Sequence, residues 1–185
     1  MDPKILTVLI VIVAIVVVAT AIFYIRRRQT EHLKQKFGSE YDRVVRQHGD
    51  PQRAETVLAA REKRISRLEL RTLPPTERDR YAQRWAVVQK QFVDDPKNSV
   101  NEADKLVTEV MNARGYPMSE FNQRADDISV NYPNAVGNYR AAHDIFLRHG
   151  SGQASTEDLR KAMVHFRSLF DELLGAPGVA HKEVA

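Results

Sequence analysis

Residues 5–25 form a predominantly apolar run, with Thr7, Thr20 and Tyr24 as its only hydroxyl side chains and with no charged residue, no glycine and no proline. As an α-helix this run would be roughly 31 Å long, which is close to the thickness of the hydrocarbon core of a bilayer. Hydrocarbon offers the backbone no hydrogen-bond partners, so a helix is the favoured way to cross it. The run therefore predicts a membrane anchor over residues 1–25.

A cleaved signal peptide is the alternative interpretation of this run. Ala19-Thr20-Ala21 matches the small-x-small pattern of a cleavage site. However, the apolar run continues for four residues beyond it, and three arginines follow at once. A secreted chain would have to carry those arginines across the membrane, so we favour the anchor.

Basic residues are concentrated on the C-terminal side of the run. Five of them follow it closely: Arg26, Arg27, Arg28, Lys34 and Lys36. Glu31 alone opposes them, whereas Asp2 and Lys4 cancel on the other side of the run. By the positive-inside rule, the rest of the chain is expected in the cytoplasm, with these five residues as a membrane-surface site for anionic lipid.

Beyond the arginines the apolar residues recur with helical spacing, and no segment alternates with the period of a strand. The expected fold class is all-α: an anchor over 1–25, a basic helical stalk over 26–75, a compact helical bundle over 76–175 and a loose tail over 176–185. Within it we expect helices over 30–48, 51–71, 76–92, 96–114, 119–130, 133–149 and 155–174.

Capping residues mark many of these helix ends. Asp50-Pro51 and Asp95-Pro96 each combine an N-cap with a proline at the first helical position. Thr76 and Asp79 resemble a capping box, and the last helix should begin at Ser155 or Thr156. Gly38 is a possible bend in the helix that follows the arginines.

The composition of the chain excludes several classes of functional site. The 185 residues contain no cysteine, which excludes disulfides, thiolate metal sites and cysteine nucleophiles. The 28 Lys and Arg exceed the 24 Asp and Glu, and the excess lies near the anchor: residues 26–67 hold 12 basic and 6 acidic residues, whereas residues 85–149 hold 7 and 9. About 160 residues after the anchor suffice for one core of ordinary size.

An aromatic stripe could stack nucleic-acid bases. Tyr81, Trp85, Val88 and Phe92 share one helix face, with three arginines beside them. An apolar stripe at this spacing is more typical of a core face. We therefore expect a core helix and consider nucleic-acid binding the weaker hypothesis.

His143 lies on an apolar stripe with Tyr139 and Phe146, where burial would lower its pKa. A metal site would need further ligands, and no His-Glu-x-x-His motif or neighbouring second histidine is present. We expect a hydrogen-bonded core histidine, and expect His165 at the rim of its helix. The alternative is an enzyme whose site forms around His143, Tyr139 and a carboxylate.

Two carboxylate pairs, Asp94-Asp95 and Asp126-Asp127, could serve acid-base or metal chemistry. The first precedes Pro96, where a cap is expected, and the second lies late in a short helix. Caps and solvated surface are the favoured interpretation. No glycine-rich phosphate loop and no Gly-x-Ser-x-Gly elbow occurs in the sequence, and no cofactor is expected.

Several short segments are similar to a known family. They are Glu69-Leu70-Arg71-Thr72-Leu73-Pro74-Pro75, Arg80-Tyr81 with Trp85, Phe92-Val93-Asp94-Asp95-Pro96, Arg114-Gly115-Tyr116-Pro117, Tyr139-Arg140-Ala141-Ala142-His143 and Ser155-Thr156-Glu157-Asp158-Leu159-Arg160. Over residues 61–174 the chain resembles a family of uncharacterised bacterial proteins with an N-terminal membrane segment and a helical domain. The resemblance implies a bacterial membrane protein and supplies no site.

The leading hypothesis is a non-enzymatic, single-pass membrane protein whose cytoplasmic helical domain binds or scaffolds another protein at the membrane surface. It depends on the apolar run, on ordinary core stripes and on the lack of a catalytic motif. The alternatives are the enzyme around His143 and Tyr139, and membrane-tethered nucleic-acid binding through the basic stalk.

Overall fold

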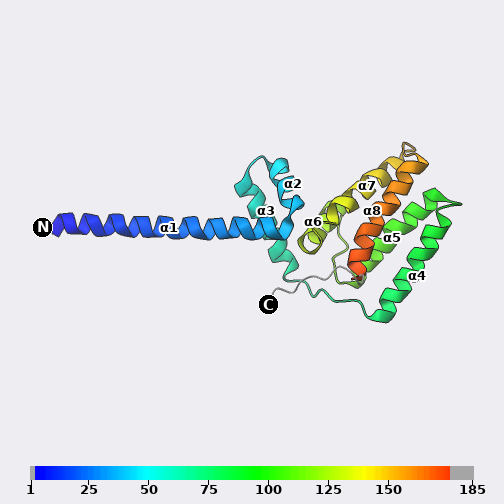
Figure 1. The fold of residues 1–185 in the computed structure, drawn as a ribbon, viewed down its shortest axis with the longest axis horizontal. Helices are drawn as coiled ribbons and strands as arrows, with labels where there is room; N and C mark the ends of the chain where they lie inside the picture. The colour runs from blue at the N-terminus through cyan, green and yellow to red at the C-terminus, as the bar shows by residue number, and fades with distance from the viewer. Residues whose placement is uncertain (1–2, 176–185) are drawn as a thin grey trace. The chain divides into compact units, whose positions relative to one another are not determined.

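The computed structural model describes residues 3–175, with side chains from residue 12 onward, and the expected tail over 176–185 lies outside the described residues. The prediction of an all-α fold is confirmed, because the described chain forms helices and no strand. The helices are α1 (Pro3–Phe37), α2 (Ser39–His48), α3 (Pro51–Ile65), α4 (Pro75–Gln91), α5 (Pro96–Ala113), α6 (Phe121–Asn131), α7 (Val136–Gly150) and α8 (Thr156–Leu174) (Figure 1).

The chain divides into two compact units, residues 1–58 and 59–185. In the first unit, α1 runs without a break from the apolar run through the arginines, and the bend predicted at Gly38 separates it from α2. Gly38 has a φ of 49°, which favours glycine. The C-terminal part of α1 contributes Leu33 and Phe37 to a small core. The other members of that core are Tyr41, Val44, Ala54 and Leu58.

In the second unit, α8 packs against both α7 and α5, and α4 packs against α5 (Figure 1). Trp85 of α4 is 3 % exposed and stacks on Phe170 of α8. Tyr81 and Val88 of the same stripe are also buried. Tyr81, Trp85 and Val88 therefore form a core face, as predicted, and are not accessible for base stacking, whereas Phe92, the fourth member of the stripe, is half-buried.

The predicted helix over 51–71 is too long, because α3 ends at Ile65. The chain after it pairs with the end of α5 instead: the Arg71 N–H donates to the Arg114 carbonyl at 3.0 Å, and Leu73 is buried. A Cβ on Gly115 would lie 2.7 Å from the Glu69 carbonyl oxygen, so the two backbones meet closely. Tertiary contact thus replaces the last turn of the expected helix.

Most predicted helix ends are confirmed. Asp50 and Asp95 accept hydrogen bonds from the backbones of Gln52 and Asn98, each at 3.1 Å, and Ser155 forms a capping box with Asp158. The capping box expected at Thr76 is wrong. There α4 begins at Pro75 with no side-chain cap, because the proline already supplies a helical φ and needs no hydrogen-bond acceptor.

The apolar run belongs to α1. For its first part, residues 5–11, the structure describes the helix but not the side chains. Among the described residues, no helix is long and apolar enough to cross a membrane.

Candidate membrane-surface site

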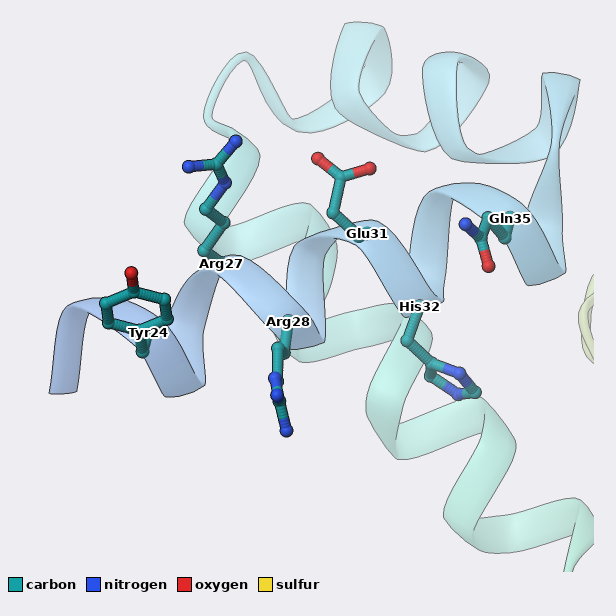
Figure 2. A pocket seen from close by; sticks show the side chains of 6 residues that line it. All are labelled: Tyr24, Arg27, Arg28, Glu31, His32 and Gln35. Carbon is teal, nitrogen blue, oxygen red and sulfur yellow. The ribbon is translucent and has the colours of Figure 1, made fainter. Parts of the chain in front are cut away.

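The helix α1 carries the predicted membrane-surface residues directly after its apolar segment. Arg26, Arg27 and Arg28 are exposed. Figure 2 shows the face of α1 on which Tyr24, Arg27, Arg28, Glu31, His32 and Gln35 line a shallow hollow of about 370 Å³. Arg27 and Glu31 point to one side of this face, whereas Arg28 and His32 point to the other (Figure 2). Cationic side chains therefore leave α1 in several directions just past the last apolar residue.

The two lysines of the predicted site lie in different surroundings. Lys34 is exposed, with its Nζ 5.7 Å from the centroid of the Tyr41 ring on α2, in a cation–π contact. Lys36 is half-buried. The three arginines and Lys34 are therefore the accessible cations of the set.

A second hollow opens between α1 and α3, inside the first unit. It has a volume of about 320 Å³ and is lined by Arg26, Gln29, Thr30, Gln52, Glu55 and Thr56. Every one of these side chains is polar or charged. One oxygen of Glu55, Oε1, accepts hydrogen bonds from the hydroxyls of Thr30 and Tyr41, both at 2.9 Å. These bonds tie α1, α2 and α3 together at the wall of the hollow.

Burial, together with the hydrogen bond to Glu55, raises the pKa of Tyr41 to about 12. The phenol therefore keeps its proton at physiological pH and continues to donate it to Glu55. This bond holds the carboxylate in a defined position, which sequence patterns did not reveal because Tyr41 and Glu55 lie on different helices.

The alternative site around His143 and Tyr139 also takes shape, with Asp104 of α5 as its carboxylate. His143 is stacked between two rings, with centroid distances of 3.5 Å to Phe121 and 6.0 Å to Phe146. The buried Nδ1 of His143 and Oδ1 of Asp104 have no hydrogen-bond partner among the described residues, whereas the Tyr139 hydroxyl interacts with the side chains of Arg124 and Thr108. The expected hydrogen bond to a core histidine is therefore wrong at Nδ1.

Burial shifts the pKa values of Asp104, His143 and Tyr139 in this cluster. Burial raises the pKa of Asp104, although the positive charge of Arg124 and the interaction with His143 oppose the shift. Burial lowers the pKa of His143, against the attraction of Asp104. Burial also raises the pKa of Tyr139. Sequence reasoning missed Asp104 and Arg124, although Asp104 directly follows the buried Ala103 on the α5 stripe.

The prediction that Asp126-Asp127 is solvated surface is wrong. Asp127 is 2 % exposed and forms an ion pair with Arg64. Asp126 pairs with Arg61 at 2.8 Å and with Arg140 at 3.2 Å. These ion pairs connect the end of α3 to α6 and α7, and their partners lie too far apart in the sequence to be recognised there. They are a structural cluster, and burial raises the pKa of Asp127.

The remaining candidate residues are structural as well. Asp95 is the N-cap of α5, and the half-buried His165 contacts Asn138, with 3.1 Å between Nδ1 and Oδ1. Over the described part of the chain, no group of three or more His, Asp and Glu side chains could hold a metal ion.

Comparison of the chain with protein-family models, curated proteins and solved structures found no match. The resemblance to bacterial membrane proteins therefore remains a prediction.

Proposed function

We propose that the chain is a single-pass bacterial membrane protein, anchored by the apolar segment of α1, whose cytoplasmic helical domain binds another protein at the membrane surface. The exposed apolar side chains of α1 carry this proposal. Ile12, Val16, Phe23 and Ile25, for example, are 54, 57, 62 and 65 % exposed. A helix that is apolar on all sides needs an apolar environment, and lipid supplies one.

The arginines support the proposed orientation. They follow Ile25 directly on the same continuous helix, so they would lie at the headgroup level when the apolar segment lies in lipid. Tyr24 sits at the boundary, which is where amphipathic rings are enriched in membrane proteins.

A hollow between α4 and α8 is the best place for the protein partner. It has a volume of about 200 Å³ and is lined by Gln89, Phe92, Arg160, Met163, Val164 and Arg167. Val164 is 58 % exposed, so apolar surface is accessible there. The ion pairs of Arg160 and Arg167 are with exposed carboxylates of their own helix, and such pairs are weak; Arg167 also donates to the Gln89 side chain of α4 at 3.0 Å. A partner segment with an apolar side chain and a carboxylate would complement this hollow.

Membrane integration and topology test the anchor. We expect the full-length chain to stay in the membrane pellet after alkaline carbonate extraction. Protease added to intact cells should leave a C-terminal tag uncut and should remove it after permeabilisation. Release by carbonate would overturn the anchor, and digestion in intact cells would overturn the orientation.

Site-specific photo-crosslinking tests the partner surface. A benzoylphenylalanine at Val164 should give a discrete crosslinked protein in cells, and the same probe at the exposed Lys97 should not. Substituting Arg160 and Arg167 with Glu should abolish the Val164 product. Equal products from both positions would contradict a specific docking surface.

An enzyme is the second candidate function, favoured by the unpartnered polar atoms of Asp104 and His143. Its test is the reactivity of His143 toward diethyl pyrocarbonate. A catalytic histidine must be reachable, so it should be modified about as fast as the exposed His48. Much slower modification, as the stacked Phe121 ring favours, would contradict the enzyme.

A further inference from the structure

We propose that the polar hollow between α1 and α3 is a binding site for an ethanolamine phospholipid headgroup, with Arg26 holding the phosphate and Glu55 the primary ammonium. This inference depends on the proposed membrane anchor, since the lipid must reach the hollow from the bilayer. It differs from the general attraction of basic residues to anionic lipid, because it assigns both charges of one headgroup.

The place of the hollow along α1 fits a lipid. Arg26 follows the last apolar residue, Ile25, and lines the hollow. Thr30 lies one helical turn further, about 6 Å along the axis. Its hydroxyl donates to Glu55 at 2.9 Å, so the carboxylate lies at that second level. In a phospholipid the phosphate is likewise nearer the acyl chains, and the amine lies beyond it.

Arg26 is available for a phosphate. Its side chain is exposed, and it makes no hydrogen bond or ion pair with any residue that the structure describes. A guanidinium offers paired N–H donors that match phosphate oxygens. The amides of Gln29 and Gln52 line the same hollow and can donate to the remaining oxygens.

Glu55 is available for an ammonium. Its Oε1 is occupied by Thr30 and Tyr41, whereas its Oε2 accepts no hydrogen bond from the described residues. The Thr56 hydroxyl uses its proton on the Gln52 carbonyl at 2.9 Å, which leaves its lone pairs as acceptors. A primary ammonium has three N–H donors for such oxygens.

The same groups disfavour other common headgroups. A choline headgroup has a quaternary nitrogen without N–H, so it cannot donate to Glu55. A glycerol headgroup brings no cation to the carboxylate and leaves the net negative charge of the lipid beside it. The hollow is therefore complementary to ethanolamine phospholipids in particular.

The test is lipid retention by the full-length protein, purified in detergent with equal amounts of ethanolamine, choline and glycerol phospholipids of the same acyl chains. Native mass spectrometry counts the lipids that stay bound. We expect about tenfold more ethanolamine than choline lipid, which is the effect of a charge-assisted hydrogen bond.

Two variants and a control locate the site. Glu55→Gln keeps an acceptor for Thr30 and Tyr41 but removes the charge, so retention of ethanolamine and choline lipid should become nearly equal. Arg26→Gln should lower retention of both about tenfold. Arg46→Gln is the control, because Arg46 is exposed in the same unit and lines neither of the hollows along α1. It should retain the preference of the parent.

Equal retention of all three lipids by the parent protein would overturn the inference, as would an unchanged preference in Glu55→Gln or an unchanged amount of retained lipid in Arg26→Gln. Carbonate extraction of the membranes from which each protein is purified separates this failure from failure of the anchor. Protein that stays membrane-integrated without lipid preference contradicts only the headgroup site, whereas extracted protein contradicts the anchor itself.

Discussion

The indole of Trp85 on α4 stacks on the ring of Phe170 on α8, with centroids 4.5 Å apart and planes inclined by 23°. Both side chains are buried, at 3 % and 1 % exposed. This buried aromatic pair joins α4 to α8, so its removal should destabilise the bundle.

We expect Trp85→Ala to lower the free energy of unfolding by roughly 3–5 kcal/mol, the usual cost of deleting a large buried aromatic side chain. Urea unfolding of the full-length protein in detergent, followed by far-ultraviolet circular dichroism, measures this change. Val87→Ala is the control, because Val87 is on the same helix and 54 % exposed, so its effect should stay within about 0.5 kcal/mol. Equal stability of both variants would mean that Trp85 is not a core residue.

Gly115 should not tolerate a side chain. It has a φ of 93°, and a Cβ there would lie 2.7 Å from the Glu69 carbonyl oxygen. Gly115→Ala therefore adds a backbone clash to the conformational strain and should cost more than about 2 kcal/mol. Gly152→Ala is the matched control, with a φ of 73° and open space around the position, and should cost about 1 kcal/mol. If the two variants lose the same free energy of unfolding, the close approach of the two backbones at Gly115 does not contribute to the cost.

Arg61 should contribute more to the free energy of unfolding than an exposed arginine does. Its side chain is 8 % exposed and pairs with Asp126 at 2.8 Å. Arg61→Ala removes one of the two ion pairs of Asp126, which keeps its pair with Arg140, so it should cost about 1–3 kcal/mol, the usual effect of removing one partner of a charged hydrogen bond. Arg160→Ala removes the exposed pair with Glu157 and should cost less than about 1 kcal/mol. Thermal unfolding of the two variants side by side distinguishes the cases.

His143 should make the stability of the bundle depend on pH. Burial lowers its pKa, so below about pH 6.5 the unfolded chain binds a proton that the folded chain does not. Stability should therefore fall as the pH decreases through this range. Fluorescence of Trp85, the only tryptophan, reports urea unfolding at each pH.

In a His143→Leu variant, the stability of the bundle should no longer fall between about pH 6.5 and the lowered pKa of the folded state. Near pH 4 the raised pKa of Asp104 acts in the opposite direction, because there the folded state holds the extra proton. The exposed His48→Gln variant should keep the pH dependence of the parent. A parent-like profile in His143→Leu would show that another group is responsible.

The basic residues after the apolar run should bind anionic lipid. A fragment of residues 26–185 should float with vesicles that contain anionic phospholipid, more weakly as salt increases, and should not float with vesicles of choline phospholipid alone. Gln at positions 26, 27, 28, 34 and 36 should abolish this binding without changing the unfolding of the bundle. Unchanged flotation would mean that other basic residues, such as those of α3 and α4, bind the anionic lipid.

The sequence alone determined the helical character of the chain and most of its helix ends. Helical spacing, Asp-Pro caps and Gly stops act through neighbours within one turn, so they can be read locally. The apolar run and its arginines are likewise a local signal. The aromatic stripe on α4 was correctly assigned to the core for the same reason.

Tertiary structure decided which polar residues meet. Asp127 and Arg64 lie 63 positions apart in the chain, so no local pattern could show that this carboxylate is buried and paired. The early end of α3, the gathering of Asp104 beside His143, and the Glu55 wall of the α1–α3 hollow likewise depend on partners from other helices. Local periodicity identifies the face of a helix that is buried, whereas only packing determines what that face meets.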